Sequence, residues 1–137
     1  MDAKAINEFL REETIMPTFV EMDARSTLSV QMEQDVRPVV LINTFTVSAD
    51  EAPELLKAWA EDAAWMKKQP GFISTQLHRG IGDSCVFLNY AVWESTYHFK
   101  RAFTDPEFQS QLLHYPPSTT VSPHLFQKVA VPGICVA

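Results

Sequence analysis

The chain has 137 residues, a length that accommodates one hydrophobic core and excludes two full domains. Its formal net charge of −6 disfavours binding to nucleic acid or to an anionic membrane as a main activity. The residues are 46% hydrophobic, but no apolar run is long enough to span a membrane, and the start lacks a signal-peptide pattern. The sequence therefore predicts a folded cytoplasmic protein.

Cysteine and histidine usage favours no metal or cofactor. Cys85 and Cys135 are far apart and lack metal-type spacing, so we expect free thiols. The histidines are equally scattered, at His78, His98, His114 and His124. No glycine-rich nucleotide loop occurs either. The sequence predicts a protein without bound metal, haem, flavin or nicotinamide.

Residues 1–36 are predicted to form an N-terminal arm outside the main domain, which we place at residues 37–137. A short helix is expected at about 3–13, and Pro17 ends that segment. The apolar residues of the arm need a surface to cover, so we expect it to pack across its own domain or a second subunit. Disorder is the alternative.

The first strand is expected at 39–47, where β-branched residues are frequent. Asn43 interrupts its otherwise apolar face, which also carries Phe45. The amide either is a polar group of a pocket or ties down a neighbouring strand. A helix follows, with Asp50 as the expected N-cap and Pro70-Gly71 as its stop. Its core stripe is Leu55, Trp59, Ala63 and Met66.

A second strand is expected at 72–79, and strict alternation puts Ile73, Thr75 and Leu77 on one face. The other face, with Phe72, Ser74, Gln76 and His78, is unusually polar. It either meets solvent or lines a cavity, and His78 is either a hydrogen-bonded structural residue or a base. A hairpin turn over 80–83 leads into the next strand.

The third strand, about 86–93, carries an asparagine and a tryptophan on the same face. Alternation places Asn89 and Trp93 on one side together with Phe87. An amide in mid-strand beside an indole predicts a pocket, because buried strands usually carry aliphatic residues on both faces. The alternative is that both are ordinary core residues with satisfied hydrogen bonds.

Two helices and a last strand complete the chain. Ser95 is a natural cap for the first helix, and Asp105 with Pro106 begins the second. The last strand is expected at 124–131. The order strand, helix, strand, strand, helix, strand predicts an α+β, ferredoxin-like split βαβ fold: a four-stranded antiparallel sheet with both helices on one face. We expect the open face to pack against a second copy in a homodimer.

From Val39 to about Val131 the chain resembles the antibiotic biosynthesis monooxygenase (ABM) domain family, a dimeric α+β barrel. The matching segments are Leu41-Ile42-Asn43-Thr44-Phe45-Thr46-Val47, Pro70-Gly71-Phe72-Ile73-Ser74-Thr75, Leu77-His78-Arg79, Asn89-Tyr90-Ala91-Val92-Trp93-Glu94-Ser95 and Asp105-Pro106-Glu107-Phe108. Together they cover about two thirds of the chain.

The resemblance implies a cofactor-independent monooxygenase that uses O2 and the phenolate of a small aromatic, polyketide-type substrate to form a quinone. It implies that Asn89 and Trp93 contact the substrate, and we add His78 as a candidate catalytic residue. Candidate substrate-binding residues are Asn43, Phe45, Phe87, Phe99 and His114. His78 or His114 is the expected proton acceptor.

The chain also departs from those oxygenases. Their helical arginine falls here in the Leu112-Leu113 region, with His114 nearby, and their tyrosine falls at Phe99. A non-catalytic binding or structural module of the same fold is therefore the alternative. A haem-degrading monooxygenase is a weaker one: Asn43 matches, but Ala102 and Leu112 stand where those enzymes have tryptophan and histidine.

Overall fold

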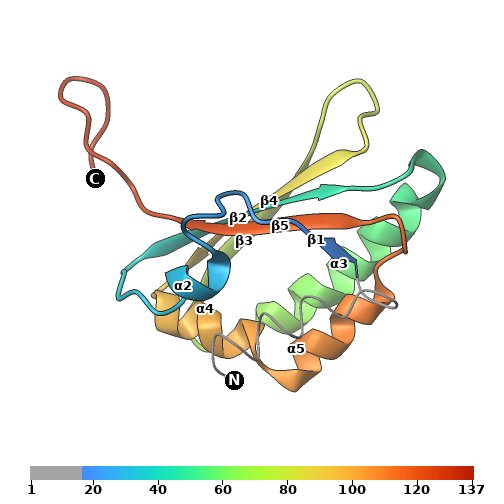
Figure 1. Ribbon diagram of the computed structural model, residues 1–137, viewed down its shortest axis with the longest axis horizontal. Coiled ribbons are helices and arrows are strands. Elements are labelled where there is room, and N and C mark those ends of the chain that lie inside the picture. The colour runs from blue at the N-terminus through green and yellow to red at the C-terminus, as the bar shows by residue number, and fades with distance from the viewer. Residues whose placement is uncertain (1–16) are drawn as a thin grey trace.

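The structure, a computed structural model, describes residues 17–137. It consists of one sheet with a layer of helices on a single face (Figure 1). The strands are β1 (Thr18–Phe19), β2 (Val39–Thr46), β3 (Phe72–Arg79), β4 (Val86–Trp93) and β5 (Thr120–Phe126). The helices are α2 (Leu28–Gln31), α3 (Ala52–Met66), α4 (Thr96–Phe103) and α5 (Pro106–Gln111), with 3-10 turns η1 (Ala49–Glu51) and η2 (Leu112–His114). The expected helix at 3–13 lies outside the described residues.

The α+β ferredoxin-like fold is confirmed, with one correction: the sheet has five strands rather than four. Their order is β1-β5-β2-β4-β3, and β1 pairs with β5 in parallel while the other pairs are antiparallel. The extra strand comes from the N-terminal arm. Two residues of extended chain, Thr18 and Phe19, gave no periodic signal from which a strand could be predicted.

Local capping explains where the later helices begin. The Ser95 side chain accepts a hydrogen bond from the His98 backbone N–H, and the Asp105 side chain accepts one from Glu107 N–H. Both caps are as predicted. The predicted cap at Asp50 is wrong: that residue lies inside η1, Ser48 precedes this turn, and α3 starts at Ala52.

The last strand lies earlier in the chain than predicted, at Thr120–Phe126 rather than 124–131. Pro123 suggested a strand boundary because proline has no N–H to donate. In the sheet, however, Val121 O accepts from Val20 N at 2.9 Å, so alternate residues from Val121 direct their backbone groups to the outer edge. Pro123 directs its nitrogen to that edge and removes no hydrogen bond to β2.

The described part of the arm packs on its own domain. The Gln31 side-chain amide donates to Leu125 O and accepts from Leu125 N, both at 2.9 Å, which continues the ladder on the outer edge of β5. Leu28 and Met32 are buried in the core. Strand β1 and the Gln31 side chain together cover the outer edge of β5, which would otherwise present unpaired backbone groups.

A β-bulge in β3 changes which side chains face the helices. The register shifts between Phe72, which is opposite Trp93, and Ser74, which is opposite Val92. Beyond the bulge, Thr75 pairs with Ala91 and lies on the helix-covered face. Strict alternation had put Phe72 and Thr75 on opposite faces, and the extra residue of the bulge brings them to the same face.

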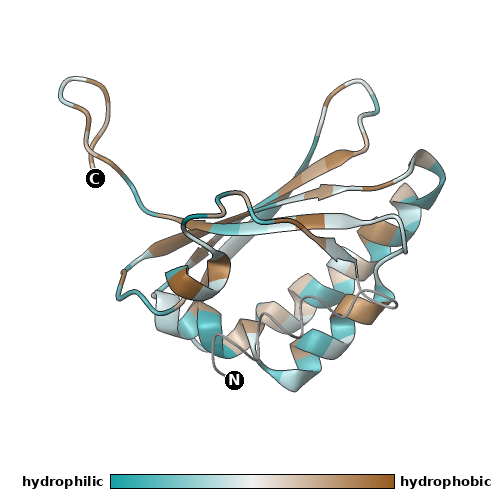
Figure 2. Cartoon of the chain, viewed as in Figure 1, coloured by the Kyte–Doolittle hydropathy of each residue, from teal (hydrophilic) through white to brown (hydrophobic). Residues whose placement is uncertain are grey.

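The opposite face of the sheet carries no helix among residues 17–137 (Figure 1). Large side chains on it stay exposed, including Val86, Tyr90 and Phe126. After β5 the chain extends away from the layered body and closes a small loop through a bridge between Val131 and Cys135. Figure 2 shows hydrophobic residues along this projecting segment. No described helix is long and apolar enough to cross a membrane.

Candidate active site

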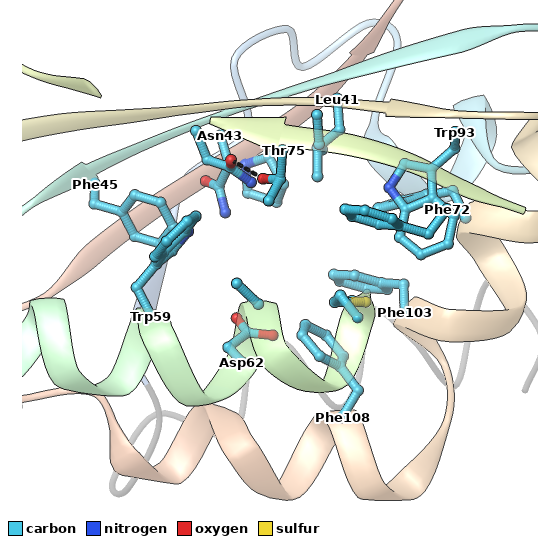
Figure 3. Close-up of a pocket in the computed structure, with 16 residues that line it drawn as sticks. Leu41, Asn43, Phe45, Trp59, Asp62, Phe72, Thr75, Trp93, Phe103 and Phe108 are labelled. Carbon is cyan, nitrogen blue, oxygen red and sulfur yellow. Dashed lines mark hydrogen bonds between the residues drawn. The ribbon is translucent and has the colours of Figure 1, made fainter. Parts of the chain in front are cut away.

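A pocket lies between the covered face of the sheet and helices α3, α4 and α5 (Figure 3). Its empty volume is about 520 Å³ when the open mouth is counted, and the centres of water-sized molecules can occupy about 60 Å³ of it. Most of its walls are aromatic or aliphatic. The lining residues are Leu41, Asn43, Phe45, Trp59, Asp62, Ala63, Met66, Phe72, Thr75, Asn89, Ala91, Trp93, Phe99, Phe103, Phe108 and Pro123.

Two asparagine amides lie side by side on the sheet wall of the pocket. Asn43 of β2 and Asn89 of β4 are directly opposite each other in the antiparallel register. The Oδ1 of Asn89 accepts from the Thr75 hydroxyl at 2.5 Å, and that of Asn43 accepts from Ser122 N at 3.0 Å. Each carbonyl oxygen is thus held by a neighbouring strand. Both NH2 groups remain available as donors, and neither has a partner among the described residues.

The indole of Trp93 closes one end of the pocket. Its ring packs edge-on against Phe72, with centroids 5.5 Å apart, and against Phe99 at 6.0 Å. Trp93 is 1% exposed, so this cluster fixes its orientation. The indole nitrogen faces the cavity (Figure 3). The pocket therefore presents three neutral N–H donors, from Asn43, Asn89 and Trp93, in apolar surroundings.

One carboxyl group faces these donors from the helix layer. Asp62 of α3 points into the cavity from the wall opposite Asn43 (Figure 3). Its Oδ2 accepts from the Tyr115 hydroxyl at 2.9 Å. Its Oδ1 is buried and has no hydrogen-bond partner within residues 17–137. Tyr115 is positioned in turn by stacking on Phe45, with ring centroids 5.8 Å apart.

Burial dominates the electrostatics of this carboxyl group. Desolvation raises the pKa of Asp62 from 3.8 to about 7, against the opposing effect of the Tyr115 hydrogen bond, which favours the ionised form. The same burial, together with the neighbouring carboxylate, raises the pKa of Tyr115 well above its ordinary value. At neutral pH, Asp62 is divided between its acid and carboxylate forms while Tyr115 stays protonated.

The structure brings five of the eight residues predicted from the sequence to this pocket: Asn89, Trp93, Asn43, Phe45 and Phe99. It places the other three elsewhere. His78 lies on the open face of the sheet, because the bulge reverses the alternation on which its assignment depended. Phe87 is buried under the Arg79 guanidinium, outside the pocket lining. His114 is exposed at the surface, 3.2 Å from Glu61.

Sequence reasoning missed Asp62, although the chain carried a signal for it. The residue lies three positions after Trp59 and seven after Leu55, on the apolar stripe of the helix. A carboxylate at such a position is rarely buried without a partner or a function. Thr75 was missed too, because the bulge could not be read from the sequence.

The described residues contain no group of three or more His, Cys, Asp or Glu side chains placed to hold a metal ion. The pocket lining likewise contains no lysine or arginine. Any negative charge that develops on a bound molecule would therefore be met by neutral hydrogen-bond donors.

The fold and the pocket define a class: an α+β ferredoxin-like protein with a pocket between its sheet and its helices. Comparison with protein families assigns it more narrowly. Residues 38–110 match the model of the antibiotic biosynthesis monooxygenase family, which covers more than half of the chain. The chain therefore belongs to this family, and the resemblance inferred from its motifs is confirmed.

Particular relatives agree with this assignment. The chain is 35% identical over 74 residues to deoxynogalonate monooxygenase of Streptomyces nogalater, a match that covers 54% of this chain and 62% of that protein. It is also similar to the crystal structure of SnoaB, a cofactor-independent oxygenase of the same organism. There the TM-score is 0.64 and the identity 28%, over 72% of this chain and 99% of the other.

A third relative is a crystallised monooxygenase-like protein of Shewanella loihica. It is 30% identical with a TM-score of 0.59, over 72% of this chain and 99% of that one. The part of this chain outside these alignments is sizeable, and the N-terminal arm lies outside the matched family domain.

Proposed function

We propose that the protein is a cofactor-independent monooxygenase that oxidises a polycyclic phenol to a quinone with O2. The observation that carries this proposal is the arrangement of three neutral N–H donors in an apolar pocket. The similarity to a deoxynogalonate monooxygenase and to a cofactor-independent oxygenase supports it.

The chemistry has to come from the substrate. Ground-state O2 reacts sluggishly with closed-shell organic molecules, so an electron-rich phenolate must act as the reductant. Electron transfer and bond formation at the carbon para to the oxygen give a dienone peroxide. The hydrogen on that carbon then moves to the outer peroxide oxygen as the O–O bond breaks, which leaves a quinone and hydroxide. With the phenolic proton returned, phenol plus O2 gives quinone plus water.

The pocket residues suit the charged stages of this reaction. Asn43 and Asn89 donate from fixed positions to oxygen atoms that gain negative charge, and Trp93 adds a third donor. Preorganised donors in a water-poor site stabilise such charge more strongly than water does. The aromatic walls, including Phe72 and Phe99, provide flat apolar surface for a fused-ring compound.

Oxygen uptake tests the proposal. The wild-type protein should consume O2 with a polycyclic phenol such as 1-naphthol or 1-anthrol, with no added metal or flavin. Asn89→Ala should reduce the rate by about 10²–10³, the usual cost of one donor to a developing oxyanion. Gln127→Ala removes an amide from an exposed position after β5 and should leave the rate unchanged. Equal rates in the Asn89→Ala and wild-type proteins would refute the assignment.

A non-catalytic binding module is the second candidate, and the absence of any lysine or arginine from the described pocket lining favours it. Phe99 and Leu112 contribute only apolar surface. This candidate predicts that phenols bind without turnover in air. One quinone formed per protein, above the uncatalysed rate, excludes it.

We also propose that two copies pair through the open sheet face. Val86, Tyr90 and Phe126 are each more than 40% exposed there, and such patches usually mark interfaces. Light scattering should give twice the mass of one chain, and Tyr90→Glu should shift it towards that of one chain. The expected compartment is the cytoplasm, which suits the free thiols of Cys85 and Cys135.

A further inference from the structure

The oxygenase reaction requires a phenolate, and the three donors of the pocket can stabilise this anion but cannot create it. A base must take the phenolic proton. Both histidines considered from the sequence are excluded from this role by position, because His78 is on the open sheet face and His114 is on the outer surface. Within the described chain, the groups that titrate at the pocket are Asp62 and Tyr115.

The carboxyl group of Asp62 is fixed by a hydrogen bond to one oxygen, and its other oxygen accepts none from the described residues. Tyr115 donates to Oδ2 and fixes the plane of the carboxyl group, while Oδ1 is buried at the pocket wall with no partner among the described residues. A buried acceptor without a hydrogen-bond donor is costly, so its retention calls for an explanation. A substrate hydroxyl that donates to Oδ1 would supply the missing hydrogen bond.

We propose that Asp62 is the general base that deprotonates the substrate, with Tyr115 as the residue that positions it. This inference rests on the proposed function and deepens it. In the step, the phenolic O–H bond breaks, a new O–H bond forms on Asp62 Oδ1, and the electron pair stays on the phenolate oxygen. The hydroxide released later takes this proton through solvent, so water forms and the carboxylate is restored.

The raised pKa of Asp62 makes this transfer feasible. A phenol has an ordinary pKa of about 10, so an ordinary aspartate near 4 would face an equilibrium of about 10⁶ against it. For Asp62, with a pKa of about 7, the figure is about 10³. The amides of Asn43 and Asn89 can offset much of the remainder. Glu61 and His114 interact with each other on the outer side of α3, outside the pocket lining.

The placement of the base also specifies the substrate class. Asp62 lies on the helix wall, and the Asn43 and Asn89 donors lie on the sheet wall (Figure 3). A phenolic oxygen held between these walls can give its proton to Asp62 and then accept from the amides. Formation of a quinone further requires O2 to add at the carbon para to that oxygen. We therefore infer a substrate with a free or activated position para to its ionising hydroxyl.

Anaerobic spectroscopy separates proton transfer from oxidation. Without O2, 1-naphthol added to the wild-type protein at pH 8 should show the red-shifted phenolate band. Asp62→Asn keeps the shape of the side chain and its acceptor for Tyr115, so it should bind naphthol with the neutral spectrum. Glu61→Gln makes the same chemical change one residue away, on the outer surface, and should behave as wild type.

Oxygen uptake by the same three proteins completes the test. Asp62→Asn should lower the rate by about 10²–10⁴, the range for loss of a general base. Infrared titration of the wild-type carboxyl band gives a check that needs no variant, with a midpoint expected near pH 7. Equal phenolate formation and equal oxygen uptake in Asp62→Asn and wild type would refute Asp62 as the base. The proposed oxygenase function would not be affected by that result.

Other outcomes divide the two proposals differently. If phenolate formation depends on Asp62 but no oxygen is taken up, the assignment of Asp62 as the base is supported and the oxygenase function is refuted. A wild-type protein that shows neither signal with 1-naphthol and 1-anthrol would overturn both.

Discussion

The hydroxyl of Tyr115 donates a 2.9 Å hydrogen bond to Oδ2 of Asp62 at the wall of an apolar pocket, and Oδ1 of the same carboxyl group is buried with no partner within residues 17–137. The two residues come from parts of the chain 53 positions apart. Their contact holds a carboxyl group whose pKa, at about 7, is close to neutral pH. This pair links the stability of the protein to the chemistry proposed for it.

Asp62 should make the folded state less stable as the pH rises. Its folded pKa of about 7 exceeds its unfolded value of 3.8, so the folded state holds an extra proton between these values. Stability from this group is fully present below pH 3.8 and is lost as the pH rises through 7. One unit of pKa difference corresponds to about 1.36 kcal/mol. The free energy of unfolding of Asp62→Asn should therefore exceed that of the wild type by at most about 4 kcal/mol at pH 8, and by little at pH 4.

Denaturant unfolding at several pH values measures this difference, with Glu61→Gln as the control on the exposed side of the same helix. A constant difference between Asp62→Asn and wild type from pH 4 to pH 8 would show that the carboxyl group titrates at an ordinary pKa.

Tyr115→Phe should move the acidic limb of the activity profile to higher pH. The hydrogen bond from Tyr115 lowers the pKa of Asp62, so its removal raises that pKa above 7. The pH dependence of kcat/KM reports this group in the free enzyme. Tyr97→Phe removes a hydroxyl from an exposed position on α4 and should leave the limb in place. A loss of activity without any movement of the limb would mean that Tyr115 only packs.

The sequence predicted the architecture well wherever the local signal was strong. Alternating β-branched runs, the Ser95 cap and the Asp105-Pro106 start gave elements that the structure confirms. The prediction that Asn89 and Trp93 lie on the same face required only the two-residue period of a strand.

What the sequence could not reveal depended on contacts between distant segments. The bulge after Phe72 moved Thr75 into the pocket and His78 out of it, because one extra residue reverses every later side chain of a strand. The partnership of Asp62 with Tyr115 needs the fold itself, since helix spacing shows only that an acid lies on an apolar stripe. Strand β1 forms only because β5 offers it an edge.

Thr75 should act through the orientation of Asn89. Its hydroxyl donates to Asn89 Oδ1, which leaves the amide N–H2 group directed to the pocket. Thr75→Val removes that hydrogen bond at almost constant volume and frees the amide to turn. We expect kcat/KM to fall by up to about tenfold, in line with one neutral hydrogen bond. Thr75→Ser keeps the hydroxyl and should retain wild-type kinetics, and equal losses in both variants would contradict this role.

Gln31 should be an anchor of the N-terminal arm. Its amide makes two 2.9 Å hydrogen bonds to the backbone of Leu125, so Gln31→Ala leaves both backbone groups unpaired. The free energy of unfolding should fall by about 1–3 kcal/mol. Gln34→Ala removes an exposed amide from the same segment and should change it by less than about 0.5 kcal/mol. Equal effects of the two substitutions would argue against edge protection by the arm.

The measurement that tests the account most directly is the fate of labelled oxygen. Under ¹⁸O₂, 1-naphthol turned over by the wild-type protein should give a quinone that carries one labelled atom, with the other atom in water and no metal or flavin required. Asn89→Ala and Asp62→Asn should each suppress this labelled product. A quinone without any labelled oxygen, or labelled product formed as fast by these variants as by the wild type, would contradict the pocket's role as the site of oxygen insertion.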